Sequence, residues 1–565
     1  MTILSSLLVF LAAAQIPDRD ARLTAPQGTN YAYVMPSYAT RAEWEARKQH
    51  LRKQILAAAG LLPLPARGPV KAEVFGKIAY TGYTIEKVLV ETMPGYFLGG
   101  NLYRPLGKSG KFPGVVSPHG HWKKGRLENT DLGSIPGRCI NLARQGYVVF
   151  AYDMVGYNDT KQTPHAFGGA REDLWNFNPL GLQLWNSIRA LDFVESLPDV
   201  DKERLAATGA SGGGTQTFLL AAVDERIRVD VPVNMVSGIM QGGSPCENAP
   251  GLRHDAFNVE FGAMMAPRPM LLVAATGDWT KNDPRLEYQA IRAIYQLYDA
   301  ASQVEQKQFD SPHNYHQGSR EAMYGFFARR ILGKDGEVKE EPFTEDADDQ
   351  MLALSGRTLP PGALDYEGVF AAWRKLTTVR EADREVLRYA LSVENPASVV
   401  AVETADAIAF TRPGRGDRIG GIYRRGTGAP LLVVHPDGAE AARAAVAFSG
   451  RPTLWLTAWQ GGRDVSARHY YTFHRTDSQN RVQDILTAVR WLQMQHPGAV
   501  EIRGVGQASV AALFAAAVAE GQVRLGSTVE NFAGTDEQFQ KDFHVPGIQR
   551  TGGLAAARKL TAGGN

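Results

Sequence analysis

Apolar runs of strand length alternate with helical patterns over the first 330 residues. The runs lie at residues 83–91, 97–103, 113–120, 146–153, 204–210 and 268–278. Segments with apolar residues at helical spacing lie at residues 41–58, 180–195 and 284–299. Strands that are apolar throughout and separated by helices indicate a parallel sheet covered on both faces. This part of the chain is therefore predicted to be a doubly wound α/β domain.

The same pattern returns in the last third of the chain. GGIYRRGTGAPLLVVHPDG at 420–438 parallels GGNLYRPLGKSGKFPGVVSPHG at 99–120 in order and residue type, and two later stretches match in the same way. Such self-similarity indicates a duplicated lobe. When the matching runs are laid together, Gly506 falls where the first copy has Ser211, and no acid or histidine follows Gly506 in the required order.

Length and this repeat together predict two lobes. A chain of 565 residues exceeds what one core usually supports. We expect a catalytic α/β lobe at 15–335, a linker at 336–365 and a degenerate, non-catalytic lobe at 366–565. The linker is expected to be an exposed connection, because the stretch that follows the first lobe is acidic and lacks apolar periodicity.

The first 14 residues, MTILSSLLVFLAAA, are predicted to be a signal peptide with maturation near Gln15. The apolar run is too short to span a membrane and ends in small residues. No basic residue precedes it, so a buried N-terminal helix stays the rival interpretation. The prediction is a secreted or periplasmic protein.

Charge and cysteine content exclude several classes of function. The 61 basic and 59 acidic residues are balanced, and no basic run indicates a nucleic-acid footprint or a membrane-surface patch. With only Cys139 and Cys246, no disulfide framework holds the chain together. Whether these two pair or stay as free thiols is open at this point.

Ser211 lies in a G-x-S-x-G motif within AATGASGGGTQTF, between a short apolar strand and a helix. This is the setting of a nucleophile elbow, which holds a serine hydroxyl at the carboxyl end of a sheet. A phosphate loop would need G-x-x-x-x-G-K-[ST], which is missing here. A plain turn is the remaining alternative.

A serine nucleophile needs a base, and the base needs an orienting carboxylate. In α/β hydrolases these follow in the order Ser, Asp or Glu, His. Asp278 stands in the turn after the apolar run MLLVAATG, and His313 leads the loop in SPHNYHQGS. Ser211, Asp278 and His313 are therefore the predicted triad, with His316 as the competing base and Asp283 as the weaker alternative acid.

Acyl transfer also needs backbone donors for a developing oxyanion. We expect them at Gly212, the residue after the nucleophile, and at His121 in the early loop SPHGHW. The imidazoles of His119 and His121 suggest a metal, but no third ligand stands at metal spacing. The prediction is therefore no metal and no cofactor.

With these residues in place, the first lobe resembles the acetyl xylan esterase-like branch of the α/β-hydrolase superfamily, over about residues 35–333. The stretches that carry the likeness are SPHGHW, AYDMVGY, DVDKERLAATGASGGGTQT, CENAPGLRHDAFNVEFGAMMAPRP, LLVAATGDWT and SPHNYHQGSREAMYGFF. The resemblance implies the same triad and hydrolysis of an ester on a polysaccharide. The elbow does not match the Gly-Cys-Ser-Arg form of glucuronoyl esterases, and the second lobe is unusual for the family.

Polar and aromatic residues near these turns are candidate carbohydrate contacts. Arginine suits a uronate carboxylate by its bidentate geometry, and tryptophan stacks on sugar rings. The candidates are Trp122, Glu247, Asn248, Arg253 and Trp279, with Trp175 nearby. For the stretch at 246–255 a solvated loop is the equal alternative. For each tryptophan taken singly, packing is favoured over a carbohydrate contact.

The leading hypothesis is a serine esterase that deacylates a carbohydrate ester, without nucleic-acid or membrane partners. Another carbohydrate esterase activity, such as a glucuronoyl esterase, is one alternative. A prolyl-oligopeptidase-type peptidase shares the order Ser, Asp, His, but no propeller-like repeat precedes the hydrolase lobe. A non-catalytic carbohydrate-binding scaffold is the alternative outside enzymes.

Overall fold

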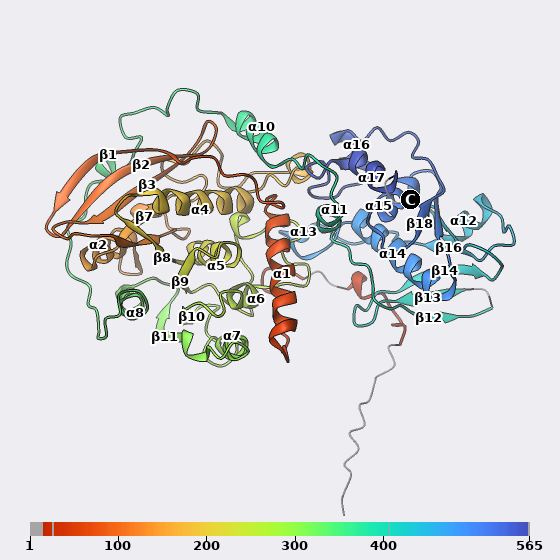
Figure 1. Cartoon of the computed structure of the whole chain (residues 1–565), viewed down its shortest axis with the longest axis horizontal. Coiled ribbons are helices and arrows are strands. Elements are labelled where there is room, and N and C mark those ends of the chain that lie inside the picture. Colours follow the sequence, from red (N-terminus) through yellow and green to blue (C-terminus); the bar gives the residue numbers. More distant parts are fainter. Residues whose placement is uncertain (1–14, 25–26, 406, 563–565) are drawn as a thin grey trace, which may run out of the picture.

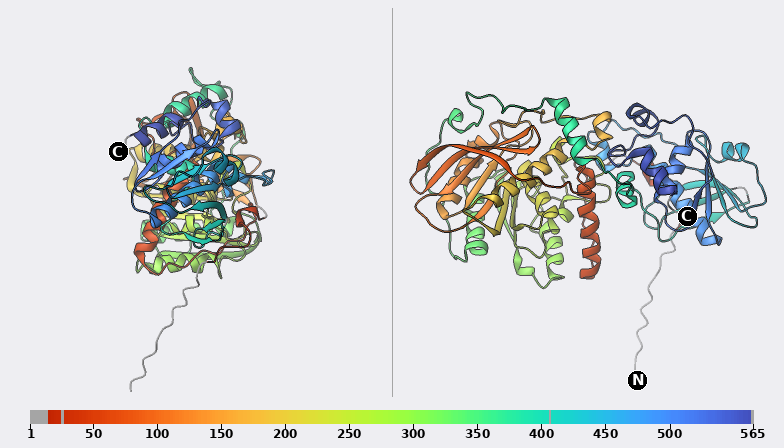
Figure 2. Two further views of the ribbon diagram at one scale, coloured as in Figure 1. Left: turned by 90° about the vertical axis from the view of Figure 1, so that its right-hand side faces the viewer. Right: turned by 45° about the horizontal axis from the view of Figure 1, so that its top comes forward.

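The computed structural model describes residues 15–24, 27–405 and 407–562. The predicted signal peptide at 1–14 lies outside these residues. Two lobes, each built on its own sheet, lie side by side along the longest axis of the molecule (Figures 1 and 2). In the described chain, no helix combines the length and the apolar character that a membrane crossing needs.

The first lobe is built on a nine-stranded sheet in the order β1-β2-β3-β7-β4-β8-β9-β10-β11. From β7 to β11 neighbouring strands are parallel, whereas β1, β2, β3 and β7 pair antiparallel. The strands span Lys71–Tyr80, Tyr83–Met93, Tyr96–Pro105, Phe112–Val116 (β4), Val148–Tyr152 (β7), Val200–Ala210, Ile227–Val233, Met270–Gly277 and Val304–Pro312. The predicted doubly wound α/β lobe is confirmed, and it has the α/β-hydrolase fold.

Helices cover both faces of this sheet, because its central strands are apolar on both sides. One face packs against α1 (Arg41–Ala58), α4 (Pro179–Ser196), α5 (Gly212–Val223), α6 (Asn258–Ala263) and α7 (Glu287–Gln296). The other face packs against α2 (Ile135–Gln145) and α8 (Gln317–Phe327). The helix at 41–58 has the predicted bounds, and a capping box at Thr40 and Glu43 fixes its start.

The second lobe has a seven-stranded sheet in the order β12-β13-β14-β16-β15-β17-β18. Its strands span Val400–Glu403, Ile408–Thr411, Ile419–Arg424, Leu431–Val434, Thr453–Thr457, Val500–Gly504 and Val523–Leu525. Helices α14 (Asp477–Gln495) and α15 (Ala508–Val518) pack on one face, and α12 (Ala439–Ala445) packs on the other.

The strand orders of the two sheets match over all seven strands of the second sheet. The order β12-β13-β14-β16-β15-β17-β18 repeats β1-β2-β3-β7-β4-β8-β9, with the same change from antiparallel to parallel pairing. The first sheet continues with β10 and β11, whereas the second sheet ends at β18. The second lobe thus lacks, among its described residues, counterparts of the two strands that precede Asp278 and His313.

The remaining elements are short or join the lobes. They are α3 (Ala170–Asp173), α9 (Asp348–Met351), α10 (Tyr366–Thr377), α11 (Arg384–Leu391), α13 (Tyr470–Phe473), α16 (Asp536–Asp542), α17 (Gly553–Ala562), the two-stranded β5 (Asn129–Thr130) and β6 (Gly133–Ser134), the 3-10 turns η1 (Ala21–Leu23), η2 (Gly125–Leu127), η3 (Pro245–Glu247) and η4 (Ala301–Gln303), and the π-helical turn η5 (Ala328–Leu332).

The connection between the lobes is exposed or partly exposed over residues 336–350, but it docks on the first lobe at Met351 and Ala353. Met351 and Ala353 are 4% and 1% exposed and lie on the first lobe. The amide of Ala353 donates to Asp159 Oδ2 at 2.8 Å, and Asn101 Nδ2 donates to Met351 O at 2.9 Å. Acidic composition concealed this docking, because the few apolar residues do not form a periodic pattern.

The two hydrophobic cores interlock across the boundary. Val369, Phe370 and Trp373 on α10 belong to the core of the first lobe, where Phe370 stacks on Phe177 at 5.2 Å between ring centroids. Leu174 of the first lobe belongs instead to the core of the second. The first core therefore extends through α10, past the predicted start of the second lobe at residue 366.

Candidate active site

Ser211 stands on the sharp bend between β8 and α5. Its φ of 59° and ψ of −128° lie in a region that residues with a side chain rarely adopt. The amide of Ser211 donates to Val233 O at 3.1 Å, which fixes the bend to the neighbouring strand β9. This strand, tight turn and helix have the geometry of a nucleophile elbow.

Two glycines let the elbow approach the loop after β4. A Cβ on Gly209 would stand 2.7 Å from Pro118 O, and one on Gly213 would stand 2.8 Å from the same atom. Such distances are closer than real Cβ atoms come to backbone. The small residues of G-x-S-x-G are therefore required by packing, on each side of the serine.

The predicted acid and base are in contact. His313 Nδ1 lies 2.8 Å from Asp278 Oδ2, at the carboxyl ends of β11 and β10. Asp278 Oδ1 accepts from the amide of Thr280 at 2.7 Å and from its hydroxyl. The carboxylate is thus held at both oxygens, and it orients the ring of His313. Nε2 of His313 is buried and has no partner among the described residues.

The competing residues have other partners. His316 caps α8, where its Nδ1 accepts from the amide of Ser319 at 3.1 Å. Asp283 is 1% exposed, and burial with the neighbouring Glu287 raises its pKa well above the usual range. Asp278, rather than Asp283, is the carboxylate within hydrogen-bond distance of the His313 ring.

The loop after β4 lies directly on the elbow. A Cβ on Gly120 would stand 2.9 Å from Ser211 Cβ, and one on Gly212 would stand 2.5 Å from His121 Cε1. Burial, together with the nearby His165 and His313, lowers the pKa of His121 to about 4. At neutral pH the His121 ring is therefore uncharged. The loop expected to supply an oxyanion donor thus contacts the bend at Ser211.

The imidazole of His119 has a structural role. Its Nδ1 lies 2.7 Å from Gly120 O, and its Nε2 accepts from the amide of Met154 at 2.9 Å. Burial lowers its pKa to about 3, so the ring stays neutral. With Nδ1 as donor and Nε2 as acceptor, His119 ties the loop after β4 to the turn after β7.

Cys246 lies beside the loop after β4, with its Sγ 3.2 Å from His121 Nε2. His165 is the third member of this cluster, and the three ligand atoms lie within 4.8 Å of one another. Sequence reasoning missed His165, because nothing in its local pattern marks it. Burial, with the charge of Glu247, raises the pKa of Cys246 well above its usual range, which keeps the thiol protonated and able to donate to His121. Cys139 and Cys246 are both free thiols and do not pair.

The polar candidates at 246–255 are buried and bind the backbone of their own loop. Glu247 Oε2 accepts from the amides of Gly243 and Ser244 at 2.7 and 2.9 Å. Asn248 Nδ2 donates to Ser244 O at 2.9 Å, and Arg253 donates to Glu247 O at 3.0 Å. The stretch is not a solvated loop, because these buried polar groups fix its backbone conformation.

The tryptophans also have defined neighbours. Trp279 lies against the ring of His313, with 4.4 Å between centroids, and its Nε1 donates to Asn234 O. Trp122 lies beside Gly133. Trp175 is further away, where Arg374 covers its ring at 3.9 Å. Trp279 therefore supports the triad histidine directly.

The second lobe reaches the loop that borders the site. The amides of Gly251 and Arg253 donate to Tyr471 O at 2.8 Å and Thr472 O at 2.9 Å, on α13. Two backbone hydrogen bonds across the lobes thus hold the 246–255 loop. Sequence reasoning missed this contact, because the pattern of one segment does not report its partner in another lobe.

Comparison with known proteins points to one family for the first lobe. Residues 84–235, from β2 to the turn after β9, match the acetyl xylan esterase (AXE1) family model. The Bacillus subtilis (strain 168) protein named "Putative hydrolase YtaP" is 28% identical over 197 residues, which are 32% of this chain and 62% of that protein. The chain thus spans less than two thirds of the length of this curated relative.

Among solved structures, "Methylesterase BT1017" is 28% identical, covering 59% of this chain and 72% of its own with a TM-score of 0.46. The acetyl xylan esterase from Paenibacillus sp. R4 is 20% identical, covering 54% of this chain and 98% of its own with a TM-score of 0.33. At these scores the fold is better judged from strand order and the elbow. On that ground and on the match over 84–235, the first lobe is an α/β-hydrolase lobe that resembles the acetyl xylan esterase family.

Proposed function

We propose that this chain is a serine esterase that removes acyl groups, O-acetyl foremost, from a polysaccharide or oligosaccharide. The observation that carries the proposal is the hydrogen bond between His313 and Asp278, in a lobe that also holds Ser211 on a strained elbow. The order Ser, Asp, His and the positions at three strand ends fit the α/β-hydrolase template. The match to the acetyl xylan esterase family supports an ester substrate.

Acylation would use these groups in sequence. Nε2 of His313 takes the proton of Ser211 as Oγ attacks the ester carbonyl, and Asp278 stabilises the imidazolium that forms. The amides of Gly212 and His121 donate to the oxyanion of the tetrahedral intermediate. Collapse breaks the bond to the sugar oxygen, which leaves with the proton from His313.

Deacylation would repeat the cycle with water. His313 takes a proton from water, the hydroxide attacks the acyl-enzyme, and Ser211 leaves with the proton that His313 returns. Acetate and the free sugar hydroxyl are the products. No metal or cofactor takes part in either half of the reaction.

The second lobe is proposed to be non-catalytic and to shape the substrate cleft. Gly506 replaces the nucleophile, and the strands that would precede an acid and a base have no described counterpart. The contact of α13 with the 246–255 loop supports this role, because the loop reaches Cys246 beside His121. We also propose export, with maturation near Gln15, since a polymeric glycan is met outside the cytoplasm.

Replacement of Ser211 by alanine tests the proposal. Ser211→Ala should abolish release of acetate from acetylated xylan while the protein stays folded, because only the nucleophile is lost. The measurement is acetate release by wild type and variant, with circular dichroism as the folding control. Turnover near that of wild type would refute the assignment.

Assays with other substrates distinguish the alternative functions. Release of methanol from a methyl-esterified uronide, without acetate from xylan, would identify a uronate methylesterase instead. Cleavage of peptide anilides would point to a peptidase. If a fluorophosphonate probe leaves a folded wild-type sample unlabelled at Ser211, the chain is a non-catalytic scaffold.

A further inference from the structure

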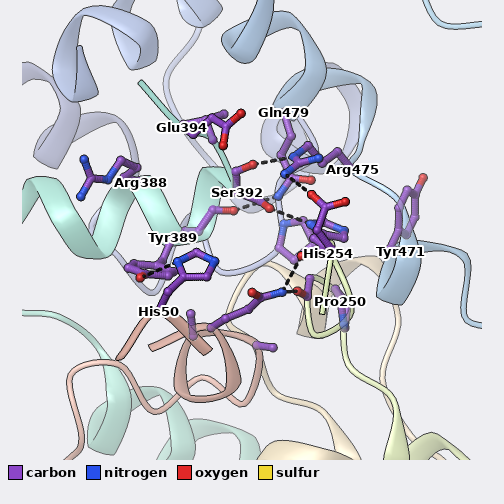
Figure 3. Close-up of a pocket in the computed structure, with 18 of the residues that line it drawn as sticks. His50, Pro250, His254, Arg388, Tyr389, Ser392, Glu394, Tyr471, Arg475 and Gln479 are labelled. Atoms are coloured by element: carbon purple, nitrogen blue, oxygen red, sulfur yellow. Dashed lines mark hydrogen bonds and ion pairs between the residues drawn. The ribbon is translucent and has the colours of Figure 1, made fainter. Parts of the chain in front are cut away.

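A polar cavity of about 340 Å³ lies between the two lobes, away from Ser211. Its walls come from α1, from the loop at 250–255, from the end of α11 and the residues after it, from α13 and the start of α14, and from the segment at 546–550. Figure 3 shows how side chains from both lobes converge on it. The volume falls within the range of small-molecule sites, about 300–1,000 Å³.

Five arginines line the cavity, and three of them form ion pairs with glutamates. Arg47 pairs with Glu260, Arg388 with Glu520, and Arg415 with Glu394, at 2.8, 3.1 and 2.6 Å. The other two lining arginines are Arg475 and Arg550.

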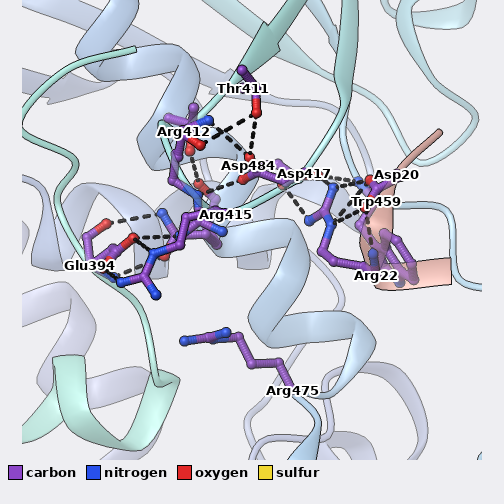
Figure 4. Close-up of polar contacts among 12 residues, drawn as sticks. Asp20, Arg22, Glu394, Thr411, Arg412, Arg415, Asp417, Trp459, Arg475 and Asp484 are labelled. Atoms are coloured by element: carbon purple, nitrogen blue, oxygen red, sulfur yellow. Dashed lines mark hydrogen bonds and ion pairs between the residues drawn. The ribbon is translucent and has the colours of Figure 1, made fainter. Parts of the chain in front are cut away.

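Glu394 and Asp255 also line the cavity, and both are paired with arginines; Figure 4 shows the contacts of Glu394. Glu394 is shared by Arg412 and Arg415, and Arg412 also binds Asp417 at 2.5 Å. Asp255 lies 3.2 Å from Arg415 and 3.7 Å from Arg475. No carboxylate of this network is therefore left for Arg475 alone.

Arg550 has no carboxylate partner within 4.0 Å in the described chain. The residue is 1% exposed, and the hydrogen bond of its guanidinium is that from Nη1 to Thr377 O at 3.2 Å. Its Nε is buried without an acceptor. Burial lowers the pKa of Arg550 to about 10, so the group is still charged at neutral pH. A buried charge without a partner is unfavourable, and an anion in the cavity would offset this cost.

Gln54 offers a hydrogen-bond acceptor without a donor. The residue is 7% exposed, and its Nε2 donates to the carbonyls of Gly251, Leu252 and His254 at 2.9 to 3.1 Å. Its Oε1 is buried and receives no donor. A ligand hydroxyl would satisfy this oxygen.

Flat side chains complete the wall. The ring of His50 lies 5.6 Å from that of Tyr389, and the two are joined at 3.1 Å between Nδ1 and the hydroxyl. Tyr471 lines the cavity from the second lobe (Figure 3). Rings of this kind contact the apolar face of a sugar while their polar tips bind hydroxyls.

We propose that the interlobe cavity binds a monocarboxylic sugar acid, with its carboxylate on Arg550 and Arg475 and a hydroxyl donating to Gln54 Oε1. A single negative charge matches the one arginine that lacks a carboxylate. The site is separate from the catalytic serine, and the inference does not depend on the esterase proposal. Because the ligand would touch both lobes, its binding would stabilise their association.

Titration calorimetry on the mature chain tests the inference, with glucuronate as the probe and glucose as the neutral control. Wild type should bind one glucuronate and should not bind glucose at the same concentration. Arg550→Gln should weaken binding of glucuronate by about tenfold or more, since charged hydrogen bonds in buried sites are strong. Arg388→Gln is the matched control, because Arg388 lines the same cavity but is paired with Glu520; it should bind like wild type.

Two further arms keep the test decisive. If Arg550→Gln fails to fold by circular dichroism, Arg475→Gln takes its place, and it should weaken binding several-fold. Binding of digalacturonate is compared with binding of glucuronate, to distinguish the end of an acidic sugar chain from a free sugar acid. Binding of either one supports a carboxylate-binding cavity. Three results would overturn the inference. They are failure of wild type to bind any sugar acid, equal binding of glucose and glucuronate, and full affinity for glucuronate in both arginine variants. Binding is read without catalysis, so an inactive enzyme would leave the inference standing.

Discussion

Ser211 and Gly506 each lie between a strand and the following helix, and both have a positive φ. Their φ values are 59° and 55°. Glycine adopts such a conformation freely, whereas a residue with a side chain is strained there by about 1–3 kcal/mol. In the first lobe the strained residue is the proposed nucleophile.

This strain makes a prediction at the elbow itself. Ser211→Gly should unfold at a higher temperature than Ser211→Ala, because only glycine relieves the backbone; about 1 kcal/mol is expected. Both variants should be inactive. Thermal unfolding of the two variants side by side gives the answer, and equal midpoints would show that the turn carries no such strain.

The two histidines of the SPHNYHQGS loop should respond differently to substitution. His313→Ala should lower kcat/KM by about 10³-fold or more, because base and nucleophile act as a unit. His316→Ala removes a helix cap and should cost about 0.5–2 kcal/mol of stability with most activity kept. Hydrolysis of p-nitrophenyl acetate and urea unfolding measure the two effects. A reversed order of activity loss would make His316 the base.

At the scale of elements, the elbow depends on how closely α5 approaches the loop after β4. Gly213→Ala should destabilise the protein by about 1–3 kcal/mol and lower activity, since the new methyl group pushes on the backbone of the loop that carries His121. Gly420→Ala on β14 is the control, because a Cβ there meets nothing within 4 Å. Urea unfolding and ester hydrolysis should separate the two; equal effects would mean that the close approach is unimportant.

Strand patterns in the sequence predicted the catalytic elements well, for a physical reason. The central strands are buried on both faces, so each is a continuous apolar run that ends in small or polar residues, as at Gly277 and Asp278. Three strands of the first sheet are not among the predicted runs. The edge strands β1 and β11 have largely exposed or half-buried residues, whereas β9 is a central, mostly buried strand. The cavity between the lobes could not be predicted, since Gln54 and Arg550 are far apart in sequence and meet only through tertiary packing.

At the scale of the whole molecule, the lobes share cores and are also tied by the start of the chain. The amide of Ala21 donates to Gly416 O in the second lobe, whereas that of Tyr33 donates to Gly238 O in the first. The guanidinium of Arg22 binds Asp484 at 2.7 Å and covers the ring of Trp459 (Figure 4). The lobes therefore depend on each other for stability.

This interdependence predicts a single thermal transition for the full chain and poor behaviour of a fragment cut at residue 335. Such a fragment loses α10, so Phe177 and its neighbours in the first core are uncovered. We expect it to be largely insoluble, or to unfold at a clearly lower temperature. Calorimetry of the full chain and solubility of residues 15–335 are the measurements; a soluble, fully active fragment would refute the dependence.

The early end of the second sheet at β18 limits what mutation can restore there. A hydrolase site of this type needs three strand ends for its serine, acid and base, and the described residues of the second lobe offer one of them, after β17. The strand β15 is the counterpart of β4, which precedes the expected oxyanion loop. Substituting serine for Gly506 would add a hydroxyl, but no strand end would hold an acid or a base beside it. Two inserted strands, and not a single substitution, would be needed to restore catalysis in this lobe. Mutations can therefore change its binding or its support of the first lobe, but point mutations do not make it an enzyme again.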